Sequence, residues 1–219
     1  MGSRYKLPAF IAAILALSII LIGCVKTAGQ PDAVSASTPA ASAQTAATAE
    51  PLLTGNGSTL IVYYSYTGTT QRVAEHLQAL TGGTLYLLEL ADPYTGGSYD
   101  VSDRVFEERG KSQMPELSGT LPDLSEYDRV LIGTPVWNSS MANPILSYLQ
   151  QTDFDDKVVA PFWTYITNQG STGKDFTANI QNGRLADGLA LRSAGGMDDE
   201  KLDNALQNWL SKLPASNNK

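Results

Sequence analysis

The sequence predicts an α/β fold built on a parallel β-sheet, and three observations support this class. Short runs rich in Val, Ile, Leu and aromatic residues alternate along the chain with segments whose apolar residues recur at helical spacing. Strands that alternate with helices form βαβ units, whose right-handed crossovers bring successive strands together in parallel. Residues 58–219 are also long enough for one domain of ordinary size with a core of its own.

Five segments are expected to be the strands of this sheet. Each is short and apolar, which is typical of a strand buried in a parallel sheet, and the fifth has the weakest pattern. In chain order they are residues 60–64, 85–90, 130–133, 158–162 and 188–191. Between the second and third strands, residues 91–99 contain Pro93 and two glycines and are expected to form a loop.

Four segments are expected to be helices, because their apolar residues recur every three or four positions. The apolar positions are Val73, Leu77 and Leu80 in the first, Val101 and Val105 in the second, Ile145 and Leu149 in the third, and Leu202, Leu206, Trp209 and Leu213 in the last. The second helix is expected over residues 100–111. Asn143 and Pro144 are expected at the N-cap and first position of the third. The acidic residues 198–200 fall in the first turn of the last helix, which Pro214 ends.

A hydroxyl-rich loop joins the first strand to the first helix. Its residues are Ser65, Tyr66, Thr67, Gly68, Thr69 and Thr70. Free N–H groups and the helix dipole attract anions to the start of a helix, and Ser and Thr hydroxyls can donate to phosphate oxygens. Because the loop lacks the lysine of a nucleoside triphosphate site, we expect a small phosphate held by neutral donors. The alternative is an ordinary strand–helix connection with a Thr residue as N-cap.

These residues resemble the phosphate loop of the flavodoxins. The pattern Ser65-x-Thr67-Gly68-x-Thr70 after a hydrophobic strand is similar to the loop that holds the phosphate of FMN in that family. The resemblance covers residues 60–213, nearly the whole domain. It implies a flavodoxin-like doubly wound sheet of five parallel strands in a three-layer αβα arrangement, with FMN bound beyond the carboxyl ends of the strands.

Two further loops follow the third and fourth strands, at residues 134–141 and 163–173, where such a sheet binds its ligand. Trp137 and Tyr165 are the candidates to sandwich the isoalloxazine ring of FMN, because aromatic faces stack on a planar ring. The rim of the ring is assigned to Asn138, Asn168 and Gly170, and Pro135 and Thr164 complete the expected cofactor-binding set. For each aromatic residue the alternative is core packing, which is favoured for Trp163 beside its strand.

The second and third loops match the family unequally. The second resembles the Pro-x-Trp pattern of a bacterial flavodoxin-like subgroup, at Pro135 and Trp137. That subgroup tends to have a Gly-Gly-Ser-Gly-type segment in the third loop, whereas residues 164–169 intervene here before Gly170 and Ser171. The sequence has no Asp-x-x-Ser/Thr-Gly-Ala-Ser/Thr segment for covalent flavin attachment, so a non-covalent FMN is expected.

The first 57 residues are expected to lie outside the fold. Arg4 and Lys6 precede an apolar run that ends in Leu-Ile-Gly-Cys, so residues 1–23 are expected to be a secretory signal peptide. The ending resembles a bacterial lipobox, which implies that Cys24 carries a lipid; an uncleaved membrane anchor and an inert thiol are the alternatives. Residues 24–57, rich in Ala, Ser, Thr and Pro, are expected to be a disordered tether. The domain would then be lipid-anchored on the extracytoplasmic side of the cell membrane.

Composition and single residues argue against several functions. The chain has 22 Asp and Glu against 15 Lys and Arg, so it lacks the basic face that a nucleic-acid partner needs. One histidine, His76, and one cysteine provide neither a metal cluster nor a thiol pair. Neither Gly-x-Gly-x-x-Gly after a strand nor Gly-x-Ser-x-Gly occurs, which argues against a built-in nicotinamide domain and a serine hydrolase.

Two classes of function remain. In the first, a monomeric FMN-binding protein carries electrons to a redox partner protein or reduces a small acceptor of the quinone type, with the chemistry in the cofactor. In the second, an extracytoplasmic binding module uses the flavodoxin fold without bound flavin. Fold alone does not decide between them, and the sequence leaves open whether the protein is an enzyme.

Overall fold

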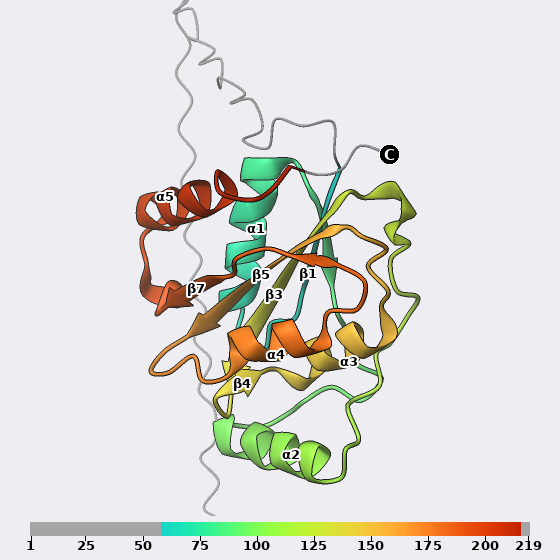
Figure 1. The fold of residues 1–219 in the computed structure, drawn as a ribbon. Coiled ribbons are helices and arrows are strands. Elements are labelled where there is room, and N and C mark those ends of the chain that lie inside the picture. The colour runs from blue at the N-terminus through green and yellow to red at the C-terminus, as the bar shows by residue number, and fades with distance from the viewer. Residues whose placement is uncertain (1–57, 216–219) are drawn as a thin grey trace, which may run out of the picture. The chain divides into compact units, whose positions relative to one another are not determined.

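The computed structural model describes residues 58–215, and Figure 1 shows their arrangement. The elements are β1 (Thr59–Tyr63), α1 (Thr69–Thr81), β2 (Thr84–Leu87), α2 (Ser98–Gly110), the 3-10 helix η1 (Leu124–Glu126), β3 (Arg129–Trp137), β4 (Ser140–Met141), α3 (Asn143–Gln151), β5 (Val158–Tyr165), α4 (Thr172–Asn179), β6 (Arg184–Leu185), β7 (Leu189–Arg192), the 3-10 helix η2 (Ala194–Gly196) and α5 (Asp199–Leu210). The expected signal peptide, Cys24 and the tether lie outside the described residues. Within that part of the chain, every helix is too short or too polar to cross a bilayer.

The strands form one sheet with the order β2-β1-β3-β5-β6. All pairs along this path are parallel, and the short β4 alone runs antiparallel, beside the end of β3. The fifth position is divided: β6 pairs with the start of β5, and β7 pairs with its end. The chain builds outward from β1 to β2 and then in the opposite direction from β3, which confirms the expected doubly wound order.

Helices cover both faces of the sheet, as the expected three layers require. Along β1 the buried side chains alternate, so Leu60 and Val62 face one layer while Ile61 and Tyr63 face the other. The first layer holds Val101, Val105, Ile145, Leu149 and Phe176 from α2, α3 and α4, and the second holds Val73, Leu77, Leu202 and Leu206 from α1 and α5. Figure 1 shows α1 with α5 on one side of the sheet and α3 with α4 on the other.

Two strands run further than the sequence predicts. Residues 134–137 and 163–165 were expected in loops, but they continue β3 and β5, because Thr134 pairs with Trp163 beyond the apolar runs. The last residues of β3 then turn back through β4 as a short hairpin. Trp163 packs in the core as expected, stacked on Phe176 at 6.3 Å between ring centroids.

The expected cap of α3 is wrong in one respect. The N-cap is Ala142, and Asn143 is the first helical residue, fully buried. Its amide is engaged elsewhere, since its oxygen accepts from Arg109 Nε at 2.8 Å and its nitrogen donates to Glu108 at 2.8 Å. Helix α4 and strand β6 had no counterpart in the sequence prediction, because α4 buries only Thr172 and Phe176 and shows no apolar stripe.

Both ends of the described chain lie at the amino ends of the strands. Ser58 precedes β1 and accepts a hydrogen bond from the backbone N–H of Asp128, just before β3. At the other end, the carbonyl of Pro214 accepts from Arg129, the first residue of β3, at 3.0 Å. The chain therefore enters and leaves the fold at the same edge of the sheet.

Candidate cofactor site

A cavity of about 850 Å³ opens at the carboxyl ends of β1, β3 and β5. Four segments at the ends of the strands line it, namely residues 65–70 apart from Gly68, 135–139, 164–168 and 193–196, together with the first half of α2. Of the 13 cofactor residues expected from the sequence, all but Gly68 and Gly170 line this cavity. None of the described residues that line it carries a charged side chain.

The 65–70 loop leads directly into α1. Gly68 is the N-cap of the helix with φ 83°, a left-handed conformation that glycine adopts without a steric cost. No side chain caps the helix, so a Thr N-cap is excluded and the first N–H groups are not taken by a capping side chain. The hydroxyl oxygen of Ser65 is buried and has no hydrogen-bond partner among the described residues. A buried hydroxyl without a partner is costly, which indicates that this loop is built to donate to a further group.

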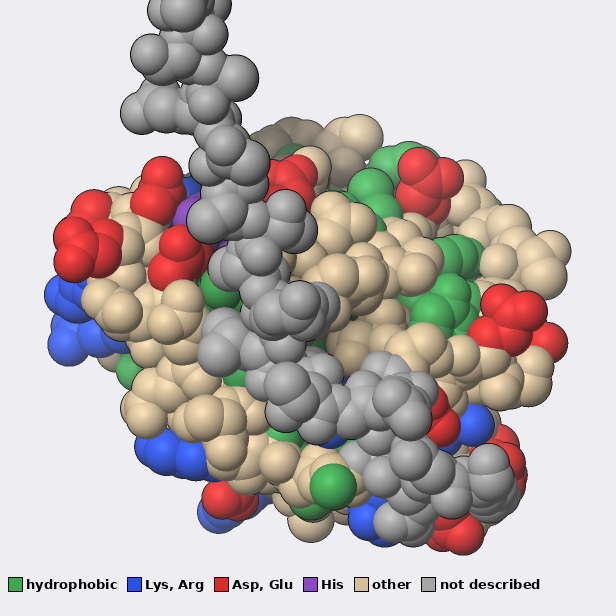
Figure 2. Space-filling view, turned by 90° about the horizontal axis from the view of Figure 1, so that it is seen from above, with side chains coloured by type: hydrophobic (Ala, Val, Ile, Leu, Met, Phe, Trp, Pro, Cys, Tyr) green, Lys and Arg blue, Asp and Glu red, His purple; other side chains and the backbone are tan. Residues whose placement is uncertain are grey.

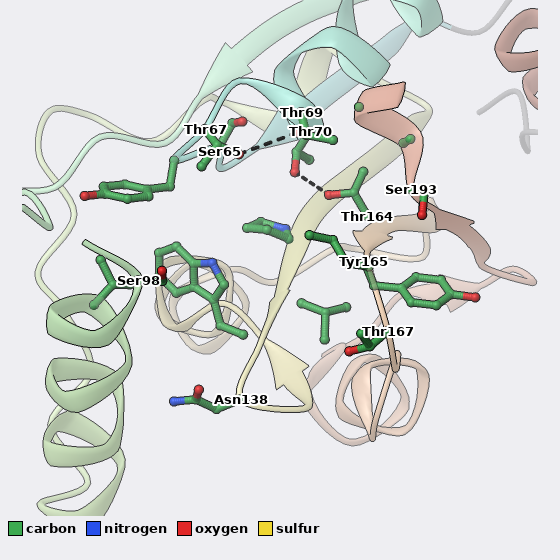
Figure 3. Close-up of a pocket in the computed structure, with 18 of the residues that line it drawn as sticks. Ser65, Thr67, Thr69, Thr70, Ser98, Asn138, Thr164, Tyr165, Thr167 and Ser193 are labelled. Carbon is green, nitrogen blue, oxygen red and sulfur yellow. Dashed lines mark hydrogen bonds between the residues drawn. The ribbon is translucent and has the colours of Figure 1, made fainter. Parts of the chain in front are cut away.

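The threonine hydroxyls of the loop differ in their surroundings. Thr70 is buried and shares a 2.9 Å hydrogen bond with Thr164 of β5, which fixes the start of α1 against the sheet. Thr67 is exposed and has a long contact of 3.5 Å with the hydroxyl of Thr69. Figure 3 shows these hydroxyls and Ser65 at one end of the cavity, which is called the phosphate end below.

The opposite, aromatic end is built around Trp137. Three tyrosine rings meet its indole nearly at right angles: Tyr64 at 5.5 Å, Tyr66 at 6.1 Å and Tyr94 at 5.0 Å between centroids. Edge-to-face contacts of this kind stabilise aromatic clusters beyond the area that they bury. Tyr66 also donates from its hydroxyl to the carbonyl of Gly96 at 2.7 Å, so the 65–70 loop is fastened over this cluster.

Charged groups behind the cluster hold Tyr94 in place. Its hydroxyl donates to the carboxylate of Glu108, and the guanidinium of Arg104 lies 4.3 Å from the centre of its ring. Arg104 in turn donates to Glu108 at 2.8 Å. Burial, and after it the hydrogen bond to Glu108, raises the pKa of Tyr94, and burial raises the pKa of Tyr64 to about 12. Both tyrosines are therefore neutral at physiological pH.

Two further residues predicted from the sequence, Tyr165 and Asn138, lie on opposite sides of the cavity (Figure 3). In Figure 3, Tyr165 lies across the cavity from Asn138 and Ser98, beside Thr167 and Ser193. Asn138 has φ 49°, and its amide exchanges two hydrogen bonds with Ser102 of α2, at 3.0 and 3.2 Å. The sandwich of a flavin ring between Trp137 and Tyr165 stays a prediction.

The third loop is locked against the second through Gly170. Its φ is 55°, and a Cβ there would lie 1.8 Å from the carbonyl oxygen of Ser139. Gly170 thus permits a close contact between two connections, and its neighbour Ser171 donates from its backbone N–H to the same oxygen at 2.8 Å. Asn168 accepts from the N–H of Gly170 at 2.8 Å, which shapes the turn.

Two lining segments were missed by the sequence prediction. One is the first half of α2, with Ser98, Val101, Ser102 and Val105; the other is residues 193–196. The second could have been found by the rule that ligands bind beyond the carboxyl ends of parallel strands, because it directly follows β7. The first depends on where α2 packs, and no local pattern signals that.

The comparisons with known proteins agree with this fold. A family model described as flavodoxin matches residues 58–213. The chain belongs to the flavodoxin family. A flavoprotein from Bacteroides uniformis is 30% identical, with a TM-score of 0.62, covering 70% of this chain and 99% of its own. One from Bacteroides eggerthii is 28% identical, with a TM-score of 0.61, covering 71% and 99%.

A flavoprotein from Lactobacillus acidophilus, whose structure was solved in complex with FMN, is also similar. It is 26% identical, with a TM-score of 0.58, covering 70% of this flavodoxin chain and 98% of its own. Among curated proteins, none matches the sequence significantly.

Proposed function

We propose that this flavodoxin binds FMN non-covalently, one molecule per chain, and passes electrons to a redox partner protein or to a small acceptor of the quinone type. The buried hydroxyl of Ser65 carries the proposal, because it lacks a partner and lies in a hydroxyl-rich loop at a helix N-terminus. The FMN complex of the Lactobacillus acidophilus flavoprotein, a structural relative of this chain, supports the choice of ligand.

The residues at the two ends of the cavity fit the two ends of FMN. Ser65, Thr67, Thr69 and Thr70 would hold the phosphate together with the first N–H groups of α1. Trp137 and Tyr165 would lie against the isoalloxazine ring. When bound, FMN supplies the redox chemistry, while the protein orients it and shields it from water. Since no charged side chain lines the described cavity, helix and peptide dipoles would be the main local source of positive potential at the phosphate.

Flavin titration tests this proposal directly. The purified full-length chain, freed of any flavin, is titrated with FMN and with riboflavin while the flavin fluorescence is followed. We expect quenching that saturates at one FMN per chain, and weaker binding of riboflavin because it lacks the phosphate. Absence of quenching at micromolar FMN would overturn the proposal and favour a binding module without flavin.

We further propose that Cys24 carries a lipid that anchors the protein outside the cytoplasmic membrane. The support is the sequence alone, a lipobox-like ending after a short apolar run. Stable anchoring takes two or more lipid chains, as one chain binds membranes only marginally. We expect Cys24→Ala to release the protein from membranes or to leave an unprocessed precursor. If this variant is processed and fractionates as the parent protein does, the lipid anchor is refuted.

A further inference from the structure

The 193–196 turn lies directly against the phosphate end of the cavity. Ser193 continues the pairing of β7, donating from its N–H to the carbonyl of Tyr165 at 2.7 Å, and then takes a left-handed conformation with φ 54°. The chain turns there toward α1. A Cβ at Gly195 would lie 3.1 Å from the hydroxyl oxygen of Thr69, so the turn and the 65–70 loop are already in close contact.

Arg72 of α1 fastens this turn. Its guanidinium donates to the carbonyl of Ala194 at 2.8 Å and to that of Met197 at 2.9 Å, and it pairs with the carboxylate of Asp199. Arg72 does not line the cavity, and its donors are engaged by the turn and by the start of α5. The planar fork of a guanidinium suits such a set of acceptors, whereas an ammonium group binds as a single point.

The contacts of Arg72 also reduce the negative charge near the phosphate end. Three acidic residues, 198–200, follow the turn, and Asp199 and Asp203 lie 3.4 and 2.7 Å from nitrogens of His76. Figure 2 shows acidic side chains gathered around the histidine on this face. Arg72 offsets the charge of Asp199 and engages the negative ends of two carbonyl dipoles, so fewer negative groups are left to oppose an anion in the cavity.

We propose that the 193–196 turn, the fourth of the segments that line the cavity, forms one side of the phosphate site; it is called the fourth wall below. Arg72 is the positioning residue that holds this turn in place. The proposal rests on FMN binding and assigns to this turn the preference for a phosphorylated flavin over riboflavin. The turn keeps the hydroxyl of Thr69 oriented into the site, and Arg72 acts through the turn without touching the ligand.

Two adjacent glycines provide a matched test. Neither Gly195 nor Gly196 has a positive φ, so the backbone accepts alanine at both. A methyl group at position 195 meets Thr69, while at position 196 it meets nothing within 4 Å. We expect Gly195→Ala to weaken FMN binding about tenfold, the effect of one lost hydrogen bond to a charged oxygen, with less than about twofold change for riboflavin. Gly196→Ala should leave both affinities unchanged.

Arg72 is tested by Arg72→Gln and by the conservative Arg72→Lys. The first should lower the ratio of FMN to riboflavin affinity about tenfold, and the second should restore part of it because lysine keeps the charge but not the fork. His76→Gln, which changes a neighbour on the same helix face, is the control and should keep the ratio of the parent chain.

The outcomes separate this inference from the function that it rests on. If the parent chain binds neither flavin, FMN binding itself is refuted. If the parent chain prefers FMN and Gly195→Ala keeps that preference, the fourth wall is refuted. If Arg72→Gln weakens FMN and riboflavin by the same factor, Arg72 is only a structural residue and its positioning role is refuted.

Discussion

The two ends of the cavity are built in different ways. The phosphate end consists mainly of six consecutive residues, 65–70, whose hydroxyls and helix N-terminus act through hydrogen bonds. The aromatic end gathers rings from three segments of the chain: Tyr64 and Tyr66 after β1, Tyr94 after β2, and Trp137 at the end of β3. The contacts of the three tyrosines with Trp137 are packing contacts. Removing one hydroxyl removes its own hydrogen bonds, whereas truncating one ring of a packed cluster weakens the packing of all the rings around it. Substitutions at the first end should therefore affect the phosphate alone, and substitutions at the second should affect the ring and the fold together.

The largest effect is expected for Trp137→Ala, which empties the centre of the aromatic end. Truncation of a packed aromatic residue costs several kcal/mol, and because Trp137 is only half-buried we expect a loss of about 2 kcal/mol in the free energy of unfolding. FMN and riboflavin should both bind more weakly, since they share the ring. Chemical denaturation and flavin titration measure the two effects. Tyr99→Ala, at a residue that is 88% exposed on α2, is the control. If Trp137→Ala weakened the binding of FMN but not of riboflavin, the contrast between the two ends would be contradicted.

The next largest effect is expected at the phosphate end. Thr67→Ala and Thr70→Ala each remove a hydroxyl that could donate to a charged oxygen, worth about 1.5–3 kcal/mol, or roughly tenfold to a hundredfold in FMN affinity. Riboflavin affinity should hardly change. Thr70 also bonds the buried Thr164, so the unfolding of the flavin-free variant measures the share that is lost stability. Equal losses for FMN and riboflavin in the Thr67 variant would mean that the loop binds no phosphate.

A smaller effect is expected for Tyr66→Phe, which removes one neutral hydrogen bond. This variant tests whether the two ends of the cavity depend on each other, because Tyr66 belongs to both. It lies in the 65–70 loop, contacts Trp137 and donates to Gly96 at 2.7 Å. Losing this neutral hydrogen bond should cost about 1 kcal/mol at most and weaken both flavins slightly. Tyr86→Phe removes a similar bond to the carbonyl of Thr120, outside the cavity, and controls for stability alone. If the two variants bind flavin equally well, the ends of the cavity are independent.

The smallest effect concerns pH at the fourth wall. The hydrogen bond and charge of Arg72 lower the pKa of Asp199, so the pair stabilises the fold above the ordinary pKa of an aspartate. As pH falls through the lowered pKa, the carboxylate is protonated and this contribution is lost. We expect Asp199→Asn to be slightly less stable than the parent chain at pH 7, and the difference to disappear as pH falls below the lowered pKa of Asp199. A difference that persists in acid would assign the effect to lost packing or hydrogen bonding.

The same contrast explains what the sequence could predict. The place of the 65–70 loop between β1 and α1 was predictable, because the strand, the hydroxyl run, Gly68 and the helix stripe are adjacent in sequence and each signal is local. The fold class followed from the alternation of strands and helices. The lengths of β3 and β5 were not predictable, because residues such as Thr134 and Trp163 become strand only by pairing with each other.

The aromatic end and the fourth wall depend on contacts between distant segments. Nothing near Tyr94 indicates that it meets Trp137, or that Glu108 receives its hydroxyl. Asn143 has the usual identity of an N-cap, yet a buried network with Arg109 and Glu108 takes its amide. Residues 193–196 combine one serine with small residues, so their role depends on Arg72, which lies more than a hundred positions earlier in the chain.

The position of the chain ends determines how this domain can be attached to other structures. Ser58 and Pro214 both contact residues at the amino ends of the strands, and the cavity opens at the carboxyl ends. Ser58 and Pro214 are therefore both on the side of the domain opposite the mouth of the cavity. A surface coupled directly at Ser58 or Pro214 should therefore leave the mouth of the cavity open to a soluble donor or acceptor.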